Sequence, residues 1–421
     1  NSWICDNMSF FSRVKSAYDG FRYANGGFIR LFDAPITDSG VDVTPKSALN
    51  SVMILRCATI KAGCGASLPI DVFKKSASGK RENVSDHPIE RIFNRAPNSR
   101  MSSMEFRAWG WMSFDLWGNF YALAVWMRNK AGERVRLAAL WPLHPGYMKI
   151  GKNEATGEPI YIYTPPGKDP QVYLPEEIFH VRWFSLDGVN GMSKIAQAAN
   201  AVGLAQVTEK HAAKFFQGGA SNRVVLKYPN ALSPEMIKVM RDNWQETYSG
   251  WENAHKAVIL EGGMDLSVLS VNPRDSQFLE QRQHNDEQMC ALMGVPPSMA
   301  GLTSKVTSWG TGIAEQKQGF LDVTMTPECV FWEKAIEAQL LLPSEQSMYV
   351  KHNVNAFLRA NLKDRMEAYR IATGIAVMNP NECRELEDMD PYEGGDVYTI
   401  QSQYIPIQQS GQNLTPGGTQ S

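Results

Sequence analysis

The chain has 421 residues, enough for two or three domains with a sizeable core. Its hydrophobic content of 43% and charged content of 20% are those of a folded protein with disorder confined to its ends. The 42 basic and 44 acidic residues give a net charge of −2, which argues against a protein that holds nucleic acid through bulk positive charge. A protein that contacts DNA without binding it tightly is still compatible with this charge balance.

Several other classes lack support in the sequence. No apolar run approaches the ~18 residues that cross a bilayer, and basic residues interrupt the aromatic N-terminus, so we expect neither a membrane span nor a secretory signal. An amphipathic arm that docks on a neighbour is favoured over a membrane-surface helix. The six cysteines form no CxxC pair, and the histidines show neither HxxxH nor HExxH spacing. We therefore expect reduced, buried thiols in a cytoplasmic protein and no metal site.

The first half of the chain alternates helical and strand patterns. Thr44-Pro45 opens a helix whose apolar residues recur at three- and four-residue spacing, and 68–73 alternates like a strand. Short helices are expected at 87–96 and 104–117. Four further strands are expected at 120–126, 134–141, 159–164 and 178–184. Residues 42–185 therefore predict a mixed α+β domain with a substantial sheet.

A stalk and a small tip follow. An Ala-rich helix is expected from 194 to about 216, closed by Gly218-Gly219. A strand at 223–228, a helix that Ser233 caps and that runs to about 249, and a hairpin of 256–260 with 266–271 form a compact unit. A second long helix comes next, so the layout is that of two helices carrying a tip unit.

That second helix is unusual in its polarity. Pro273 at its start is favourable, and no Gly or Pro occurs from 274 to 292. The segment 280–288 contains no apolar residue, whereas a helix of an ordinary globular domain carries an apolar stripe. Gly294-Val295-Pro296-Pro297 then ends the helix, and a polar loop holds Lys305 and Trp309. These features suggest a channel or a joint rather than a catalytic pocket.

The C-terminal part is helical and then acidic. A helix is expected at 313–342 with an interruption at Pro327, another closes at Gly374, and Asn379 to Glu382 is a capping box. Acids dominate 382–396, with Arg384 as the single base. A solvated helix end is favoured there over a surface that repels DNA phosphates. From 401 on, the composition predicts a disordered tail.

Catalytic signatures are missing. The chain has no phosphate loop and no GxGxxG after a strand, and Gly191-Met192-Ser193-Lys194-Ile195 is not a nucleophile elbow. Asp115, Asp187 and Glu105 come from unrelated segments and are expected to be surface charges. His284 could be a switch near neutral pH, but a solvated histidine is favoured. We expect no catalytic residue, no cofactor and no enzyme activity.

The order of short motifs resembles the portal protein family of long-tailed, siphophage-type bacteriophages with double-stranded DNA. The similar residues span about 46 to 396, and their joint order is more specific than any one of them. They are His87-Pro88, Pro97-Asn98, Glu105-Phe106, Gly118-Asn119-Phe120-Tyr121, His180-Val181-Arg182, Gly188, Gly191-Met192-Ser193, Phe216-Gln217-Gly218-Gly219, Phe278-Leu279-Glu280, Gly294-Val295-Pro296-Pro297, Asn381-Glu382-Cys383-Arg384 and Glu393-Gly394-Gly395-Asp396.

The resemblance implies an α+β portal fold assembled as a ring, and it divides the chain into named regions. The α+β wing is expected at 42–193, the helical connection between wing and crown at 313–354, and the helical crown at 355–400. An N-terminal arm (1–41) and a disordered tail (401–421) flank them. Stem helix 1 (194–220) and stem helix 2 (273–298) enclose a small α/β clip (221–272), and a tunnel loop (299–312) follows.

The resemblance also implies site residues. The helix stop is Pro296 with Pro297. The tunnel loop would face DNA through Thr303, Ser304, Lys305, Val306, Thr307, Ser308 and Trp309. The channel side of the stem is expected to carry Glu280, Gln281, Gln283, His284 and Glu287. The clip would dock the packaging motor through Ser233, Glu235, Lys238, Arg241, Asp242 and Gln245.

By this resemblance we expect a dodecameric ring at the unique capsid vertex of the virion, assembled in the host cytoplasm, through which double-stranded DNA enters and leaves without sequence recognition. Its expected partners are the large terminase, the major capsid or scaffolding protein and a head-completion adaptor, with no membrane. Two alternatives stay open. One is another head–tail adaptor or virion structural protein without a channel. The other is a nucleic-acid enzyme, which would need a carboxylate cluster or a phosphate loop.

Overall fold

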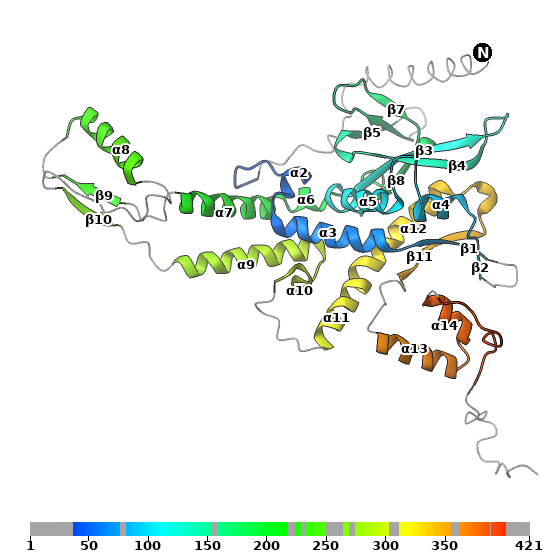
Figure 1. The fold of residues 1–421 in the computed structure, drawn as a ribbon. Coiled ribbons are helices and arrows are strands. Elements are labelled where there is room, and N and C mark those ends of the chain that lie inside the picture. Colours follow the sequence, from blue (N-terminus) through cyan, green and yellow to red (C-terminus); the bar gives the residue numbers. More distant parts are fainter. Residues whose placement is uncertain are drawn as a thin grey trace, which may run out of the picture. The chain divides into compact units, whose positions relative to one another are not determined.

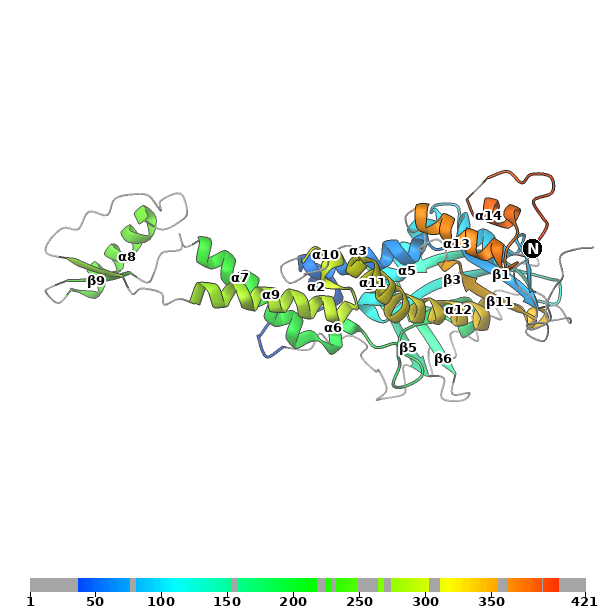
Figure 2. The same cartoon turned by 90° about the horizontal axis from the view of Figure 1, so that it is seen from below.

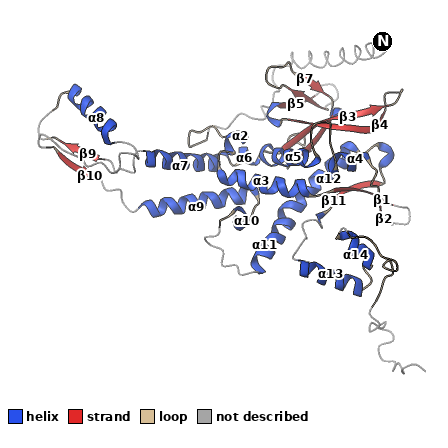
Figure 3. Ribbon diagram, in the orientation of Figure 1, coloured by secondary structure: helices blue, strands red, loops and turns tan. Residues whose placement is uncertain are grey.

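A computed structural model describes residues 37–75, 81–152, 158–217, 224–228, 232–248, 264–268, 274–302, 311–354, 362–387 and 389–400. The chain divides into two compact units, Asn1–His352 and Asn353–Ser421. The first unit mixes helices with small antiparallel sheets, and the second is helical in its described part (Figure 3). The α+β fold class is therefore confirmed.

The centre of the first unit is a set of helices around stacked aromatic rings. Helices α3 (Val52–Ser67), α5 (Ser103–Trp117) and α12 (Thr326–Leu340) meet there. Trp332 stacks on Trp111 at 5.7 Å and on Phe120 at 5.2 Å between ring centroids. A Cβ at Gly65 would lie 2.1 Å from the Trp111 ring, so only glycine lets this ring approach α3. Burial of these large rings provides the main apolar stabilisation of the unit.

The sheets are smaller than the sequence predicts. The expected strands exist as β1 (Ile70–Lys75), β3 (Asn119–Arg128), β4 (Arg134–Leu143), β6 (Pro159–Tyr163) and β8 (Ile178–Arg182). They do not form one substantial sheet. They belong to three sheets with the strand orders β4-β3-β8, β5-β6-β7 and β11-β1-β2. The added strands are β2 (Arg81–Asn83), β5 (Met148–Lys152), β7 (Gln171–Tyr173) and β11 (Met348–His352).

Short elements connect these parts. The further helical elements of the first unit are α2 (Pro45–Ala48), α4 (Pro88–Asn94), η1 (Pro145–Tyr147), η2 (Pro175–Glu177) and η5 (Pro343–Glu345). Strand β11 pairs with β1 over Ile70↔His352 to Lys74↔Met348, so two segments far apart in the sequence share one sheet.

Two long antiparallel helices pack side by side (Figures 1 and 2). The first was expected as one helix from residue 194, but it consists of α6 (Lys194–Gln197) and α7 (Ala199–Gln217). The backbone leaves helical geometry at Ala198, where φ is −103° and ψ is 23°. The second is α9 (Arg274–Met293), which begins and ends within a residue of its predicted bounds.

The tip unit contains α8 (Pro234–Tyr248), β9 (Val224–Lys227) and β10 (Asp265–Val268). Strand β10 pairs antiparallel with β9. The expected partner of β10 in a hairpin, 256–260, lies outside the described residues.

The helix after the polar loop does not break at Pro327. It runs from α11 (Thr311–Phe320) through a π-helical segment, η4 (Leu321–Met325), into α12. Proline lacks an N–H and collides with the carbonyl four residues earlier in an α-helix. For Pro327 that residue is Val323, inside η4, so the wider π turn accommodates the ring where an interruption was expected.

The second unit is held by polar contacts. Its helices are α13 (Leu362–Gly374) and α14 (Pro380–Leu386). The predicted capping box is present, with the Asn379 side chain accepting from Glu382 N and Glu382 accepting from Asn379 N. Arg365 forms a bidentate pair with Glu387 at 2.8 and 2.9 Å. The acidic run is therefore more than a solvated helix end, since part of it ties the two helices together.

One hydrogen-bond network explains why several of the family-like motifs occur together. The Asn119 side chain donates to the Gly191 carbonyl at 2.8 Å and accepts from Gly191 N at 2.8 Å. His180 Nε2 lies 2.9 Å from the same Asn119 oxygen. Burial lowers the pKa of His180 to about 3, so its ring is neutral and can donate from Nε2. The network joins the start of β3, strand β8 and the loop before α6.

Gly118 allows this network to close. Its φ is +70°, and a Cβ there would lie 2.1 Å from the Met192 carbonyl oxygen. Gly132 also has a positive φ, +82°, but a Cβ added there would have no neighbouring atom within 4 Å. We expect Gly132→Ala to lower the free energy of unfolding by about 1–2 kcal/mol, because alanine is strained in the left-handed backbone conformation. Gly118→Ala should cost about 2–3 kcal/mol more, because the new methyl also displaces the loop. Urea unfolding followed by tryptophan fluorescence measures both, and equal costs would contradict the close approach.

Candidate functional site

Helix α9 carries the predicted polar segment, and part of it is freely accessible. Glu280, Gln281, Gln283 and His284 are exposed, and Glu287 is half-buried. Gln288 Nε2 lies 3.1 Å from His284 Nε2, one turn earlier on the exposed side. The solvated position that was favoured for His284 is confirmed.

The other half of α9 is packed against its own chain. Asn285, Met289, Cys290 and Met293 are buried, and α9 contacts α3 and α7. The polar segment 280–288 is therefore not exposed throughout, because Asn285 within it is buried. The amide Nδ2 of Asn285 has no hydrogen-bond partner among the residues that the structure describes. Burial raises the pKa of the adjacent Asp286.

Two buried cysteines form the contact between α3 and α9. Cys57 Sγ and Cys290 Sγ lie 3.9 Å apart, with no disulfide between them. The hydrogen bond to Cys290, together with burial, raises the pKa of the Cys57 thiol. The described cysteines are all free, as expected, and three of them are buried: Cys57, Cys290 and Cys329.

The helix stop is built by backbone geometry and one threonine. Gly294 has φ +70°, and Val295 N donates back to the Cys290 carbonyl at 3.0 Å. Thr324 Oγ1 donates to the Gly294 carbonyl at 2.7 Å, which ties the stop to η4. Pro296 then precedes the short helix α10 (Pro297–Ala300). The predicted tunnel-loop residues Thr303 to Trp309 lie outside the described part of the chain.

The predicted docking residues lie on α8. Ser233 Oγ accepts from Met236 N at 3.3 Å, the expected helix cap. Glu235, Lys238, Arg241 and Asp242 follow along the helix, and all four are exposed. Gln245 belongs to the same helix. The structure therefore collects these six residues on one element.

A cluster of four buried charges joins α3, α5, α6 and α12. Lys61 and Lys194 each donate to both Asp115 Oδ1 and Glu328 Oε1, at distances from 2.6 to 2.8 Å. All four side chains are at most 8% exposed. Asp115 was expected on the surface, which is wrong, whereas Asp187 and Glu105 are exposed as expected. We call this arrangement the charge cluster.

The opposite charges of the cluster act against the effect of burial, although for Lys61 burial prevails and lowers the pKa. Burial alone would raise the pKa of Asp115, but Lys194 and Lys61 hold it below its ordinary value. Burial would likewise lower the pKa of Lys194, yet Asp115 and Glu328 raise it. Two positive and two negative groups give a neutral set, which is what allows them to be buried together. One oxygen each of Asp115 and Glu328 lacks a hydrogen-bond partner within the described ranges.

Sequence reasoning missed Lys61, Lys194 and Glu328. Lys61 carried a signal, because it lies on the buried side of a helix whose neighbours there are small or apolar. A lysine in such a position needs an anion. Nothing local identifies which one, since Asp115 and Glu328 lie 54 and 267 residues away.

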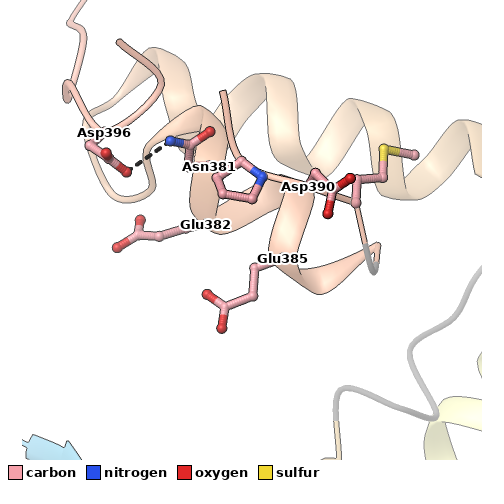
Figure 4. A pocket seen from close by; sticks show the side chains of 7 residues that line it. Asn381, Glu382, Glu385, Asp390 and Asp396 are labelled. Atoms are coloured by element: carbon pink, nitrogen blue, oxygen red, sulfur yellow. Dashed lines mark hydrogen bonds between the residues drawn. The ribbon is translucent and has the colours of Figure 1, made fainter. Parts of the chain in front are cut away.

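A pocket lies in the second unit, at α14 and the loop that follows it (Figure 4). Glu382, Glu385, Asp390 and Asp396 line it. Two of these carboxylates already accept hydrogen bonds from their own chain. Asn381 donates to Asp396 at 2.9 Å, and the Tyr398 hydroxyl donates to Glu382 at 2.7 Å. Across the described residues, no group of three or more His, Cys, Asp or Glu side chains is arranged to hold a metal ion. None of the described helices is long and apolar enough to cross a bilayer.

Comparison with known proteins identifies the class. The model of the phage portal protein family matches residues 53–388, so the chain belongs to the phage portal protein family. The portal protein of Enterobacteria phage HK97 is 29% identical over 420 residues, covering 97% of this chain and 96% of that protein. The probable portal protein of Streptomyces phage phiC31 is 27% identical over 370 residues, covering 86% and 79%. Portal proteins are structural components rather than enzymes, which disfavours the enzyme alternative.

Solved structures share the fold. An HK97-family phage portal protein from Corynebacterium diphtheriae superposes with a TM-score of 0.56 at 13% identity, covering 76% of this chain and 99% of that one. The neck of a native gene transfer agent particle, computed with C12 symmetry, contains a chain with a TM-score of 0.53 at 19% identity. That match covers 85% of this chain and 98% of the other.

Removal of one member of the charge cluster tests its role. We expect Asp115→Asn to lower the free energy of unfolding by about 3–5 kcal/mol, because it leaves two buried lysines with one carboxylate. Lys61→Met should be similarly costly. The double variant should cost less than the sum, since it leaves the neutral pair of Lys194 with Glu328. Urea unfolding gives all three values, and additive costs would contradict the cluster. Glu105→Gln is the control and should leave the free energy of unfolding nearly unchanged, because Glu105 is exposed and glutamine also serves at this capping-box position.

The same variants carry a pH signature. The folded-state pKa of Asp115 is depressed, so its contribution is complete above the unfolded value of about 3.9 and is lost as the pH falls through the folded value. The stability difference between the wild type and Asp115→Asn should therefore shrink in acid and be constant from about pH 5 to 8.

Proposed function

We propose that this chain forms the ring of twelve subunits at one vertex of a phage capsid, and that DNA enters and leaves the particle through its centre. The large terminase docks on the ring during packaging, and a head-completion adaptor binds it afterwards. Membership of the portal protein family supports this role, and the C12 symmetry applied to the neck of the gene transfer agent particle supports the subunit number.

One observation in the structure carries the proposal. Five consecutive residues of α9, 280–284, are all exposed. At roughly 3.6 residues per turn, five residues span the whole circumference of a helix, so every side of this segment carries side chains that are open to solvent. A polar helix end of this kind is suited to a ring in which copies of the helix lie side by side around a water-filled passage. Glutamate and glutamine along the passage would avoid the counterion-releasing phosphate contacts that hold DNA in place.

The parts of the chain would then divide the work. Helices α7 and α9 form the stem, α8 and its two strands form the clip, and the loop 299–312 faces the passage. The second unit forms the crown. Channel residues Glu280, Gln281, Gln283, His284 and Glu287 lie in the stem, and the terminase docks on α8.

The oligomeric state is the first test. The purified chain should form a closed ring of twelve copies, visible by negative-stain microscopy and measurable as the dodecamer mass by native mass spectrometry. A protein that stays monomeric at high concentration, both alone and in assembled particles, would end the proposal. ATP turnover or nuclease activity intrinsic to the chain would do the same.

In vitro packaging with the cognate terminase and procapsids separates the clip from the loop. Lys238→Glu with Arg241→Glu on α8 should abolish terminase binding while rings still form, because both cations are exposed. Arg136→Glu, an exposed cation on β4, is the control and should bind normally. Lys305→Glu or Trp309→Ala should leave terminase binding intact but reduce packaged DNA or its retention. Normal packaging by both sets of variants would contradict these assignments.

A further inference from the structure

The first unit exposes apolar side chains on α3. Val52 is 73% exposed, and Leu55, one turn later, is also exposed. Arg56 lies beside them on the same helix and is exposed as well. We call these three residues the α3 face. An apolar stripe on a helix normally points to the core, so this helix has an inner face and a second, outer one.

A second exposed apolar surface lies where the loop after β8 meets α12. Leu186 is 88% exposed and Val323 is 78% exposed, and Phe184 and Val330 are exposed as well. The Phe184 ring packs edge-on against the Phe331 ring of α12, with centroids 5.2 Å apart. We call Phe184, Leu186, Val323 and Val330 the α12 face.

The loop that presents Leu186 is rigidly built. The Asp187 carboxylate accepts from Val189 N at 2.8 Å, from Asn190 N at 2.7 Å and from Ser185 Oγ at 2.9 Å. Met192 N donates to the Phe184 carbonyl at 2.8 Å, which closes the loop. A preformed loop that holds a leucine in water loses little conformational entropy when that leucine enters a partner, so it is suited to binding.

Val52 of the α3 face and Val330 of the α12 face lie on the outer sides of their helices. Lys61 of α3 and Glu328 of α12 point toward each other across 2.7 Å. Val52 is nine residues before Lys61, and Val330 is two residues after Glu328. With roughly 100° per residue, each lies about half a turn away from that contact on its own helix. On these two helices, Val52 and Val330 therefore face away from the contact between Lys61 and Glu328.

We propose that the α12 face of one copy packs on the α3 face of the next copy, and that this pairing is the contact between neighbouring wings. The inference rests on the ring of the proposed function. A cyclic ring requires a heterologous contact, in which each subunit presents two different surfaces on opposite sides. Charge agrees with this pairing, because Arg56 belongs to one face and the exposed Asp322 adjoins Val323 on the other.

Two variants remove one face each. Val52→Asp with Leu55→Asp disables the α3 face, and Leu186→Asp with Val323→Asp disables the α12 face. Val52, Leu186 and Val323 are largely exposed and Leu55 is 42% exposed, so the fold should persist, as circular dichroism and thermal unfolding of each variant would verify. Each variant alone should be monomeric under conditions in which the wild type is a ring. The matched control is Met127→Asp with Val135→Asp, two exposed apolar residues of β3 and β4, which should still give rings.

Mixing the two variants tests the pairing itself. Each retains the face that the other lacks, so an equimolar mixture should give 1:1 dimers and nothing larger in native mass spectrometry. Rings from either variant alone, or a mixture that stays monomeric, would overturn the inference. Loss of assembly in the control would also overturn it, because apolar area anywhere would then suffice. A wild type that forms no ring would instead refute the proposed function, so the two failures are distinguishable.

Discussion

The charge cluster is the constraint on which the first unit depends. Lys61, Lys194, Asp115 and Glu328 come from four helices, and each cation contacts both anions. A buried charge without a partner is far costlier than a buried pair, so none of the four helices can move away without exposing the others to that cost. Because each lysine lies 2.6 to 2.8 Å from both carboxylates, all four contacts are short only in one relative position of the helices.

This position matters because of what the four helices carry. Helix α6 leads into α7, one of the two long antiparallel helices, and α12 continues η4 and α11, which follow the polar loop. Helix α3 packs on α9, the other long helix, where Cys57 meets Cys290. The core that holds the cluster thus fixes the start of α7, the end of α9 and the helix that follows the polar loop. A second tie is the hydrogen bond from Thr324 to Gly294, which links the end of α9 to the π-helical segment.

The sequence predicted local structure well and long-range chemistry poorly. Helix α9 was predictable because its bounds depend on nearby glycine and proline. The packing of α9 was not predictable, because the burial of Met289, Cys290 and Met293 depends on α3, which is far away in the sequence. Asp115 was misread for a similar reason: its partners Lys61 and Lys194 lie 54 and 79 residues away, and periodicity carries no information at such separations. Pro327 predicted an interruption because the rule for proline assumes an α-helix, and a π turn removes the collision.

The charge cluster and the two exposed apolar faces belong to one physical arrangement. Lys61 directs the inner side of α3 toward α12, and the same helix geometry turns Val52 and Leu55 outward. Glu328 acts in the same way on α12, where Val330 faces out. A subunit that must contact two neighbours at a fixed angle needs a stiff element between its two contact surfaces, since any play would accumulate around a ring and prevent closure. In the proposed ring, the buried ion pairs between the two helices would contribute to that stiffness.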